Sequence, residues 1–138
     1  MAIRKKKVVK VKLTLKEQGV LKECKLLIQK NPKLKRKGLD KMKDLDKRLY
    51  YIRVWAITES NPLHKLRNFK KRCWKGRGCQ HLDHIVPIAK GYLDNIPPEK
   101  IGSMTNLRFI PWKENIKKGH KMTEASHRVL RKLKRSDP

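Results

Sequence analysis

The stretch HLDHIVPIAKGY, residues 81–92, places two histidines and an aspartate within four positions of a lysine-rich chain. Its first eight residues form a short β-prone segment, and glycine and proline interrupt the chain soon afterwards. The pattern predicts a strand that ends at Asp83 and His84, followed by a loop. Because side chains alternate along a strand, His81 shares the face of Asp83.

The sequence after this strand predicts a second strand and two helices. NLRFIP, residues 106–111, has the pattern of a short strand, and WKENIKKGHK, residues 112–121, that of a short helix ending near Gly119. Thr123 can then cap a basic C-terminal helix. The apolar residues of that last helix are Val129, Leu130 and Leu133.

The N-terminal half predicts two helices. TLKE, residues 14–17, has the form of a capping box, and apolar residues recur at helical spacing until Asn31 and Pro32. Cys24 lies on the apolar face of this helix and is expected in the core. A second helix should begin near residues 38–40 and end before residues 60–62. We expect the two helices to pack as an antiparallel pair, with a further helical turn or two in the basic run that follows.

The chain therefore divides into four parts. They are a basic flexible arm at 1–13, a basic helical region at 14–72, a strand–loop–strand–helix unit at 73–121, and a basic C-terminal helix and tail at 122–138. The predicted fold class is α+β, mostly α-helical.

Charge points to a polyanionic partner. The chain has 38 lysines and arginines against 12 aspartates and glutamates, a formal charge of +26. The charge runs through the whole chain instead of lying on one face of a single amphipathic helix, which favours nucleic acid over a membrane surface. We expect a nucleic acid as the partner.

Apolar content and cysteines bear on the compartment. No stretch approaches the roughly 20 apolar residues that a membrane span requires, and the N-terminus lacks the apolar core of a secretory signal. Three cysteines are an odd number and give no disulfide framework, which suits a reducing compartment. The sequence predicts a soluble, cytoplasmic protein with no membrane partner.

Four elements in order complete a recognisable pattern. They are D-H-I-V-P from Asp83, K-G at 90–91, N-L from Asn106, and N-x-x-K-G from Asn115. Across residues 73–121, about a third of the chain, this pattern resembles the ββα-metal core of the HNH endonuclease family. The resemblance implies phosphodiester hydrolysis supported by a divalent metal ion.

The resemblance also implies roles for individual residues. His84 matches the general base, and Asp83 and Asn115 match the metal ligands. Asn106 matches the asparagine that bridges the hairpin and holds the catalytic histidine in orientation. A histidine has a pKa near neutral pH, which suits a base, and a hard cation can be held by one carboxylate, one amide oxygen and waters. We therefore expect Mg²⁺ or Mn²⁺.

Three more polar residues of this segment are candidates for the site. Lys118, one helical turn after Asn115, is placed to contact a phosphate. His120 and His81 are possible further site residues, although a surface position explains His81 more simply. Cys73 and Cys79 lack the second cysteine pair that many family members carry, so a structural zinc is not expected unless His81 or His64 completes such a site.

The sequence thus predicts a metal-dependent DNA endonuclease that nicks or cleaves DNA with weak or modest sequence specificity. The alternative is a non-catalytic, basic nucleic-acid-binding or architectural protein, whose Asp-His and Asn residues only stabilise turns. A third possibility is a nuclease unit that works within a larger assembly. Small stand-alone enzymes of this family are frequent in phages and mobile elements, which is an association only.

Overall fold

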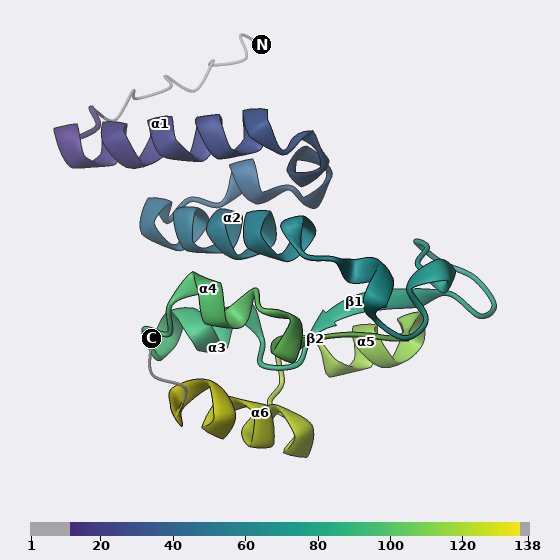
Figure 1. The fold of residues 1–138 in the computed structure, drawn as a ribbon. Coiled ribbons are helices and arrows are strands. Elements are labelled where there is room, and N and C mark those ends of the chain that lie inside the picture. Colours follow the sequence, from purple (N-terminus) through teal and green to yellow (C-terminus); the bar gives the residue numbers. More distant parts are fainter. Residues whose placement is uncertain (1–11, 136–138) are drawn as a thin grey trace, which may run out of the picture.

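Residues 12–135 are described by the computed structural model, which is mostly helical with one two-stranded sheet. The chain starts with a pair of long helices, continues into a β-hairpin with short helices inserted in it, and ends in a C-terminal helix (Figure 1). This is the predicted α+β fold class. The basic arm, apart from residues 12 and 13, and the last three residues of the tail lie outside the described residues.

The first helix, α1 (Leu15–Lys30), begins where the sequence predicts. The Thr14 hydroxyl accepts a hydrogen bond from the backbone N–H of Glu17 at 3.2 Å, as a capping box requires. The helix buries Cys24 and Ile28, and Asn31 ends it. The prediction of a core position for Cys24 is confirmed.

The second helix, α2 (Leu45–Ser60), starts later than predicted. Residues 32–37 and 39–41 form separate 3₁₀ helices, η1 (Pro32–Lys37) and η2 (Leu39–Lys41), around Gly38 at φ 66°. The Asp44 side chain then accepts from the N–H of Lys47 at 3.2 Å and caps α2. Leu39 and Met42 fit a helical spacing with α2, but the left-handed Gly38 and the cap at Asp44 set the actual boundaries.

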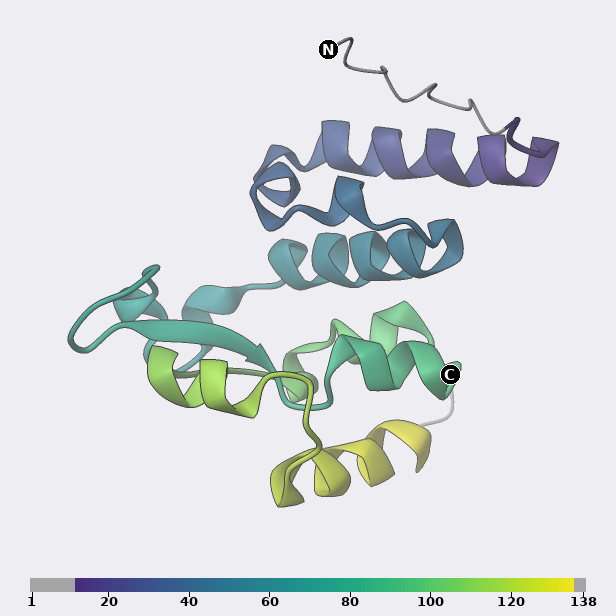
Figure 2. The same cartoon turned by 180° about the vertical axis from the view of Figure 1, so that it is seen from behind.

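The two long helices run parallel, so the predicted antiparallel pairing is wrong. Thr14 and Glu17 at the start of α1 line a surface pocket together with Asp44 and Leu45 at the start of α2. The segment between the helices returns along their length before α2 begins, as seen from both sides (Figures 1 and 2). A salt bridge between Glu23 and Arg53 links their exposed middles.

Two short 3₁₀ helices, η3 (Leu63–Lys65) and η4 (Phe69–Lys71), confirm the predicted helical turns after α2. The hairpin follows. Strands β1 (Gln80–His84) and β2 (Leu107–Pro111) pair antiparallel, with Asp83 opposite Arg108. Helix α5 (Trp112–Lys118) packs against both strands, as predicted.

The segment between the strands is more ordered than the predicted loop. It holds two short helices, α3 (Ile88–Leu93) and α4 (Pro98–Ile101), and the 3₁₀ turn η5 (Met104–Asn106). The prolines that argue against a long helix serve here as helix starts: Pro98 is the first residue of α4. Ile88, Ile96 and Ile101 bury this segment in the core.

Helix α2 lies between two apolar clusters and joins the halves of the molecule. One cluster packs α1, η1 and η2 against it, and the other packs α3, α4 and the last helix, α6 (Glu124–Arg135), against it. Trp55 contacts both clusters. The Thr123 hydroxyl accepts from the N–H of Ser126 at 3.2 Å, as expected of the cap of α6. Within residues 12–135, no helix combines the length and the apolar character needed to cross a bilayer.

Cys73 and Cys79 form a disulfide, with their Cα atoms 5.4 Å apart, so the expectation of no disulfide is corrected. Gly76 and Gly78, at φ 130° and 76°, fold the six-residue separation back on itself, which brings the two thiols together. An odd cysteine count did not exclude one bridge, because Cys24 is buried and free in α1.

Gly91 is a test of how tightly α3 and α4 pack. A β-carbon at this position would lie 2.5 Å from both Ile101 Cγ1 and the Tyr50 hydroxyl oxygen. We expect Gly91→Ala to lower the free energy of unfolding by about 1–3 kcal/mol, measured by urea denaturation. The control is Gly19→Ala in α1, where nothing lies within 4 Å. That change should raise stability by about 0.5–1 kcal/mol. Equal effects of both changes would contradict this packing.

Candidate active site

A cleft of about 330 Å³ opens between α2, with η1 and η2 beside it, and the strand β1 with α5. Asp83, His84 and Asn115 line it together, although they come from a strand and a helix some thirty residues apart. His120, just beyond α5, also lines it, while Lys37 and Trp55 form its opposite wall. The structure therefore brings the predicted metal ligands and the predicted base to one place.

The Asp83 carboxylate is buried and bonded to two cations. Arg108, its partner across the hairpin, donates from Nε to one oxygen at 2.9 Å, and Lys118 donates from Nζ to the other at 2.8 Å. The carboxylate is 6% exposed, so its charge has to be balanced inside the protein. β1, β2 and α5 are thereby tied together at one side chain.

The predicted phosphate contact of Lys118 does not match this geometry. Its ammonium is buried and donates both to Asp83 and to the backbone carbonyl of His84, the latter at 2.9 Å. Lys118 faces inward because α5 packs on the hairpin with this side chain over β1. Its role is to hold Asp83 and the end of β1, not to meet a phosphate at the surface.

His84 is held by α2 through Thr58. The Thr58 hydroxyl gives its one proton to the carbonyl of Val54 at 2.7 Å, so it can only accept from the ring nitrogen Nε2 of His84, 2.9 Å away. A neutral ring protonated at Nε2 carries its lone pair on Nδ1. Thr58 thus sets the tautomer and leaves Nδ1 as the basic nitrogen.

Burial keeps the His84 ring neutral. Loss of solvent, and then the charges of Lys37 and Lys118, lower the pKa of His84 to about 3. Trp55 packs edge-on against the ring at 4.7 Å between centroids. The imidazole is therefore unprotonated at neutral pH, and the expectation of a pKa near neutrality is corrected: the value lies well below the operating pH that best suits a general base.

Asn106 braces the backbone next to His84 but does not bond its ring. Its side-chain oxygen accepts from the N–H of Val86 at 2.7 Å, and its amide donates to the carbonyls of Ile101 and Val86 at 2.8 and 3.2 Å. The predicted bridging of the hairpin fits this arrangement. The prediction that Asn106 orients the histidine ring is corrected: the ring nitrogen Nε2 bonds Thr58 of α2 instead.

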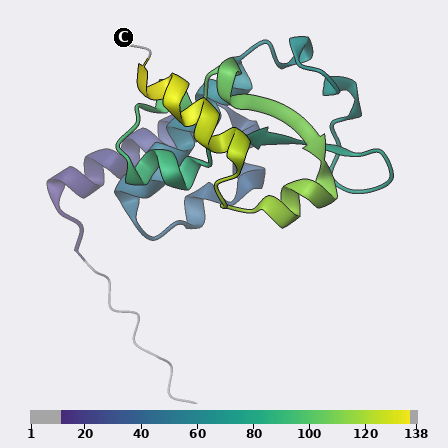
Figure 3. The ribbon, with the colours of Figure 1, turned by 90° about the horizontal axis from the view of Figure 1, so that it is seen from below.

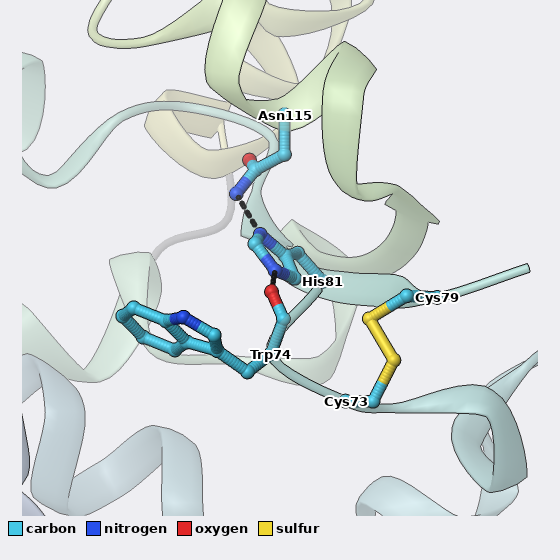
Figure 4. The surroundings of a disulfide bond; sticks show 5 residues. All are labelled: Cys73, Trp74, Cys79, His81 and Asn115. Carbon is cyan, nitrogen blue, oxygen red and sulfur yellow. Dashed lines mark hydrogen bonds between the residues drawn. A yellow bond between two sulfur atoms is a disulfide. The ribbon is translucent and has the colours of Figure 1, made fainter. Parts of the chain in front are cut away.

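His81 is half-buried on β1 and bonds Asn115, so it belongs to the candidate site and is not an incidental surface residue. One ring nitrogen, Nε2, lies 2.6 Å from the Trp74 carbonyl, which can only accept, so Nε2 donates (Figure 4). In the neutral ring, Nδ1 then accepts from the Asn115 amide at 3.2 Å. This bond uses the nitrogen of the Asn115 side chain and leaves its oxygen free to act as a ligand.

The cleft holds the two oxygen donors predicted as metal ligands, Asp83 and Asn115. Across the described residues, no group of three or more His, Cys, Asp or Glu side chains could hold a metal ion. Mg²⁺ keeps several waters and needs few protein ligands, so Asp83 and Asn115 are the two side chains that would hold it. Each Asp83 oxygen accepts one bond and retains a further lone pair for a cation.

Lys37 is a cleft residue that sequence reasoning missed. Its ammonium lies 3.5 Å above the centre of the Trp55 ring and 3.8 Å from Glu59. Burial lowers the pKa of Lys37 to about 8; Glu59 opposes that shift and Arg72 adds to it. It is one of 38 cations in the chain, so only the fold distinguishes it from the others.

Comparisons with known proteins add no relative. No family model, no curated protein and no solved structure matches this chain. The chemical interpretation of the cleft depends on its own residues.

The His84 tautomer is directly measurable. Nitrogen NMR of the histidine rings should show His84 protonated at Nε2 and neutral at pH 7 and down to pH 5. Thr58→Ser keeps the hydroxyl and should preserve this state, whereas Thr58→Val should not. A ring protonated at Nδ1 in the wild-type protein would contradict the assignment.

Proposed function

We propose that this protein is a metal-dependent DNA endonuclease of the HNH type. The observation that carries the proposal is the meeting of Asp83, His84 and Asn115 in one cleft, with His84 bonded through Nε2 to Thr58 and so left basic at Nδ1. A protein that only binds nucleic acid needs positive charge but has no use for this set. The formal charge of +26 supports a polyanionic substrate.

Asp83 and Asn115 are the residues that would hold a divalent ion. Such an ion, Mg²⁺ or Mn²⁺, supplies positive charge for the phosphate and lowers the pKa of bound water when present. Asp83 is fixed for this role by Arg108 and Lys118, and Asn115 by His81. Both side chains therefore lose little conformational freedom on binding.

His84 acts as the general base. Its Nδ1 takes a proton from water, the water oxygen bonds to phosphorus, and the bond from phosphorus to the 3′ oxygen breaks. The 3′ oxygen receives a proton from solvent, and the products are a 5′ phosphate and a 3′ hydroxyl. Thr58 holds the ring in place throughout by accepting a hydrogen bond from the Nε2–H group.

Lys37 contacts the substrate phosphate in this proposal. It replaces Lys118, whose ammonium is occupied by Asp83. Lys37 reaches the cleft from η1, and its ammonium lies over the Trp55 ring. Its ion pair with Glu59 is long, at 3.8 Å, so the ammonium can also contact a phosphate. Arg72 holds Glu59 more closely, at 2.7 Å.

Plasmid cleavage tests the proposal. The wild-type protein should convert supercoiled plasmid to nicked or linear DNA with Mg²⁺ or Mn²⁺ and not with chelator. His84→Gln should lower the rate by about 10²–10⁴-fold, since it removes the base. Asn115→Ala, at a half-buried position, is the second variant in case His84→Gln perturbs the core; it should raise the metal concentration required. If the wild type cuts no better than either variant while all three shift DNA on a gel, the protein is a binder.

Lys37 has its own test. Lys37→Gln should lower kcat/KM by about 10²-fold, and Lys35→Gln, an exposed neighbour in η1 with the same charge change, should have little effect. Since the pKa of Lys37 is about 8, the wild-type kcat/KM should fall as the pH rises through 8 and the ammonium loses its charge. Lys37→Arg should move that fall to higher pH. An unchanged alkaline limb in Lys37→Arg would exclude the phosphate role.

A further inference from the structure

A loop at residues 73–79 projects from the body just before β1 (Figures 1 and 3). The Cys73–Cys79 disulfide closes its base (Figure 4). The N–H of Cys73 donates to the carbonyl of Gln80 at 3.3 Å, and that of Cys79 to the carbonyl of Gly76 at 3.1 Å. The disulfide and these two hydrogen bonds therefore hold the base of the loop in place.

Trp74 is the most exposed of the large apolar side chains in the described part of the chain, at 87%. The other large apolar side chains that are exposed are on α1, α3 and α5: Leu15, Leu26, Leu93 and Ile116. None is in the loop, and the other apolar side chains of the cleft that Trp74 lines, those of Trp55 and Leu82, are half-buried. Trp74 is therefore not part of a large exposed apolar patch. A protein partner would normally require such a patch.

Exposed basic residues flank Trp74 in the sequence. Lys75 and Arg77 are exposed, and residues 73–79 contain no acidic side chain. Lys70 and Lys71 precede the loop and are also exposed. An isolated aromatic ring among cations is the arrangement that binds unpaired nucleic-acid bases, because the ring stacks on a base while the cations meet phosphates.

We propose that the 73–79 loop binds single-stranded or unstacked DNA, with the Trp74 indole stacked on a base and Lys75 and Arg77 on the flanking phosphates. This deepens the proposed function by naming a substrate class, DNA with an unpaired segment beside the cleavage site. It rests on that function only for the statement that the bound strand is cut.

The loop is connected to the candidate active site. The Trp74 carbonyl accepts a hydrogen bond from His81, and His81 accepts one from Asn115 (Figure 4). Trp74 is therefore linked through His81 to Asn115, a predicted metal ligand. A second cleft of about 270 Å³ is lined by Trp74 and His81 and shares Lys37, Trp55 and Asn115 with the first. A strand stacked on Trp74 can therefore follow the adjoining clefts to His84.

Binding measured in chelator separates this inference from catalysis. The probes are two fluorescein-labelled DNAs of equal length, one fully paired and one with a single-stranded gap, titrated with wild type, Trp74→Ala, Trp74→Phe and Leu93→Ala. Trp74→Ala should weaken binding to gapped DNA by about 5- to 150-fold and change binding to duplex less than about threefold. Trp74→Phe should keep most of the affinity, and Leu93→Ala, an exposed apolar control on α3, should match wild type.

Equal affinity of Trp74→Ala and wild type for gapped DNA would overturn the inference, as would equal weakening on both DNAs. Because no cleavage occurs in chelator, either result leaves the nuclease proposal standing. If the wild-type protein does not cleave DNA with metal, but Trp74→Ala still weakens binding to gapped DNA, only the nuclease proposal is contradicted.

The flanking cations have a separate readout. Lys75→Gln and Arg77→Gln should each reduce the salt dependence of binding to gapped DNA by about 0.7 in the log–log slope, the value for one single-strand phosphate contact. Slopes equal to that of wild type would remove the loop cations from the interface.

Discussion

The structure around the cleft depends on one buried carboxylate. Asp83 accepts from Arg108 on β2 and from Lys118 on α5, so a single side chain of β1 bonds both elements that pack against it. Removing one partner from a buried ion pair typically costs about 3–5 kcal/mol, because a charge is left uncompensated. The Asp83 carboxylate thus holds β1, β2 and α5 together, and the proposed chemistry uses the same carboxylate as a metal ligand.

The same arrangement has a consequence for metal binding. Two cations already face one carboxylate, so the site carries a net positive charge before any ion enters. A divalent cation meets repulsion there unless a phosphate is also present. Under the proposed function, the metal ion and DNA therefore strengthen each other's binding, as linkage requires.

Local sequence patterns were enough for the parts of the fold with local causes. The cap at Thr14, the strands at 80–84 and 107–111, and the helix that ends before Gly119 all follow from residues within a turn or two. The parallel direction of the long helices did not, because it depends on how residues 31–44 return along the pair. Helix α2 starts later than predicted because the cap at Asp44 fixes its first residue, although the apolar spacing further back is equally good.

The candidate site divides in the same way. Asp83, His84 and Asn115 belong to one ordered pattern and could be selected from the sequence. Thr58 and Lys37 could not, since they approach His84 and its cleft from 26 and 47 positions away and have no local motif. His81 had a local indication, the alternation that puts it on the face of Asp83, but its bond to Asn115 required the packing of α5 on β1.

A crystal structure with Mn²⁺ and a short DNA, with the metal located by anomalous scattering, shows directly whether the cleft binds an ion. We expect a peak bonded to an Asp83 oxygen and to the side-chain oxygen of Asn115, with His84 Nδ1 turned toward the same phosphate. DNA bound in the cleft with no metal at Asp83, or a metal bound only elsewhere on the chain, would contradict it.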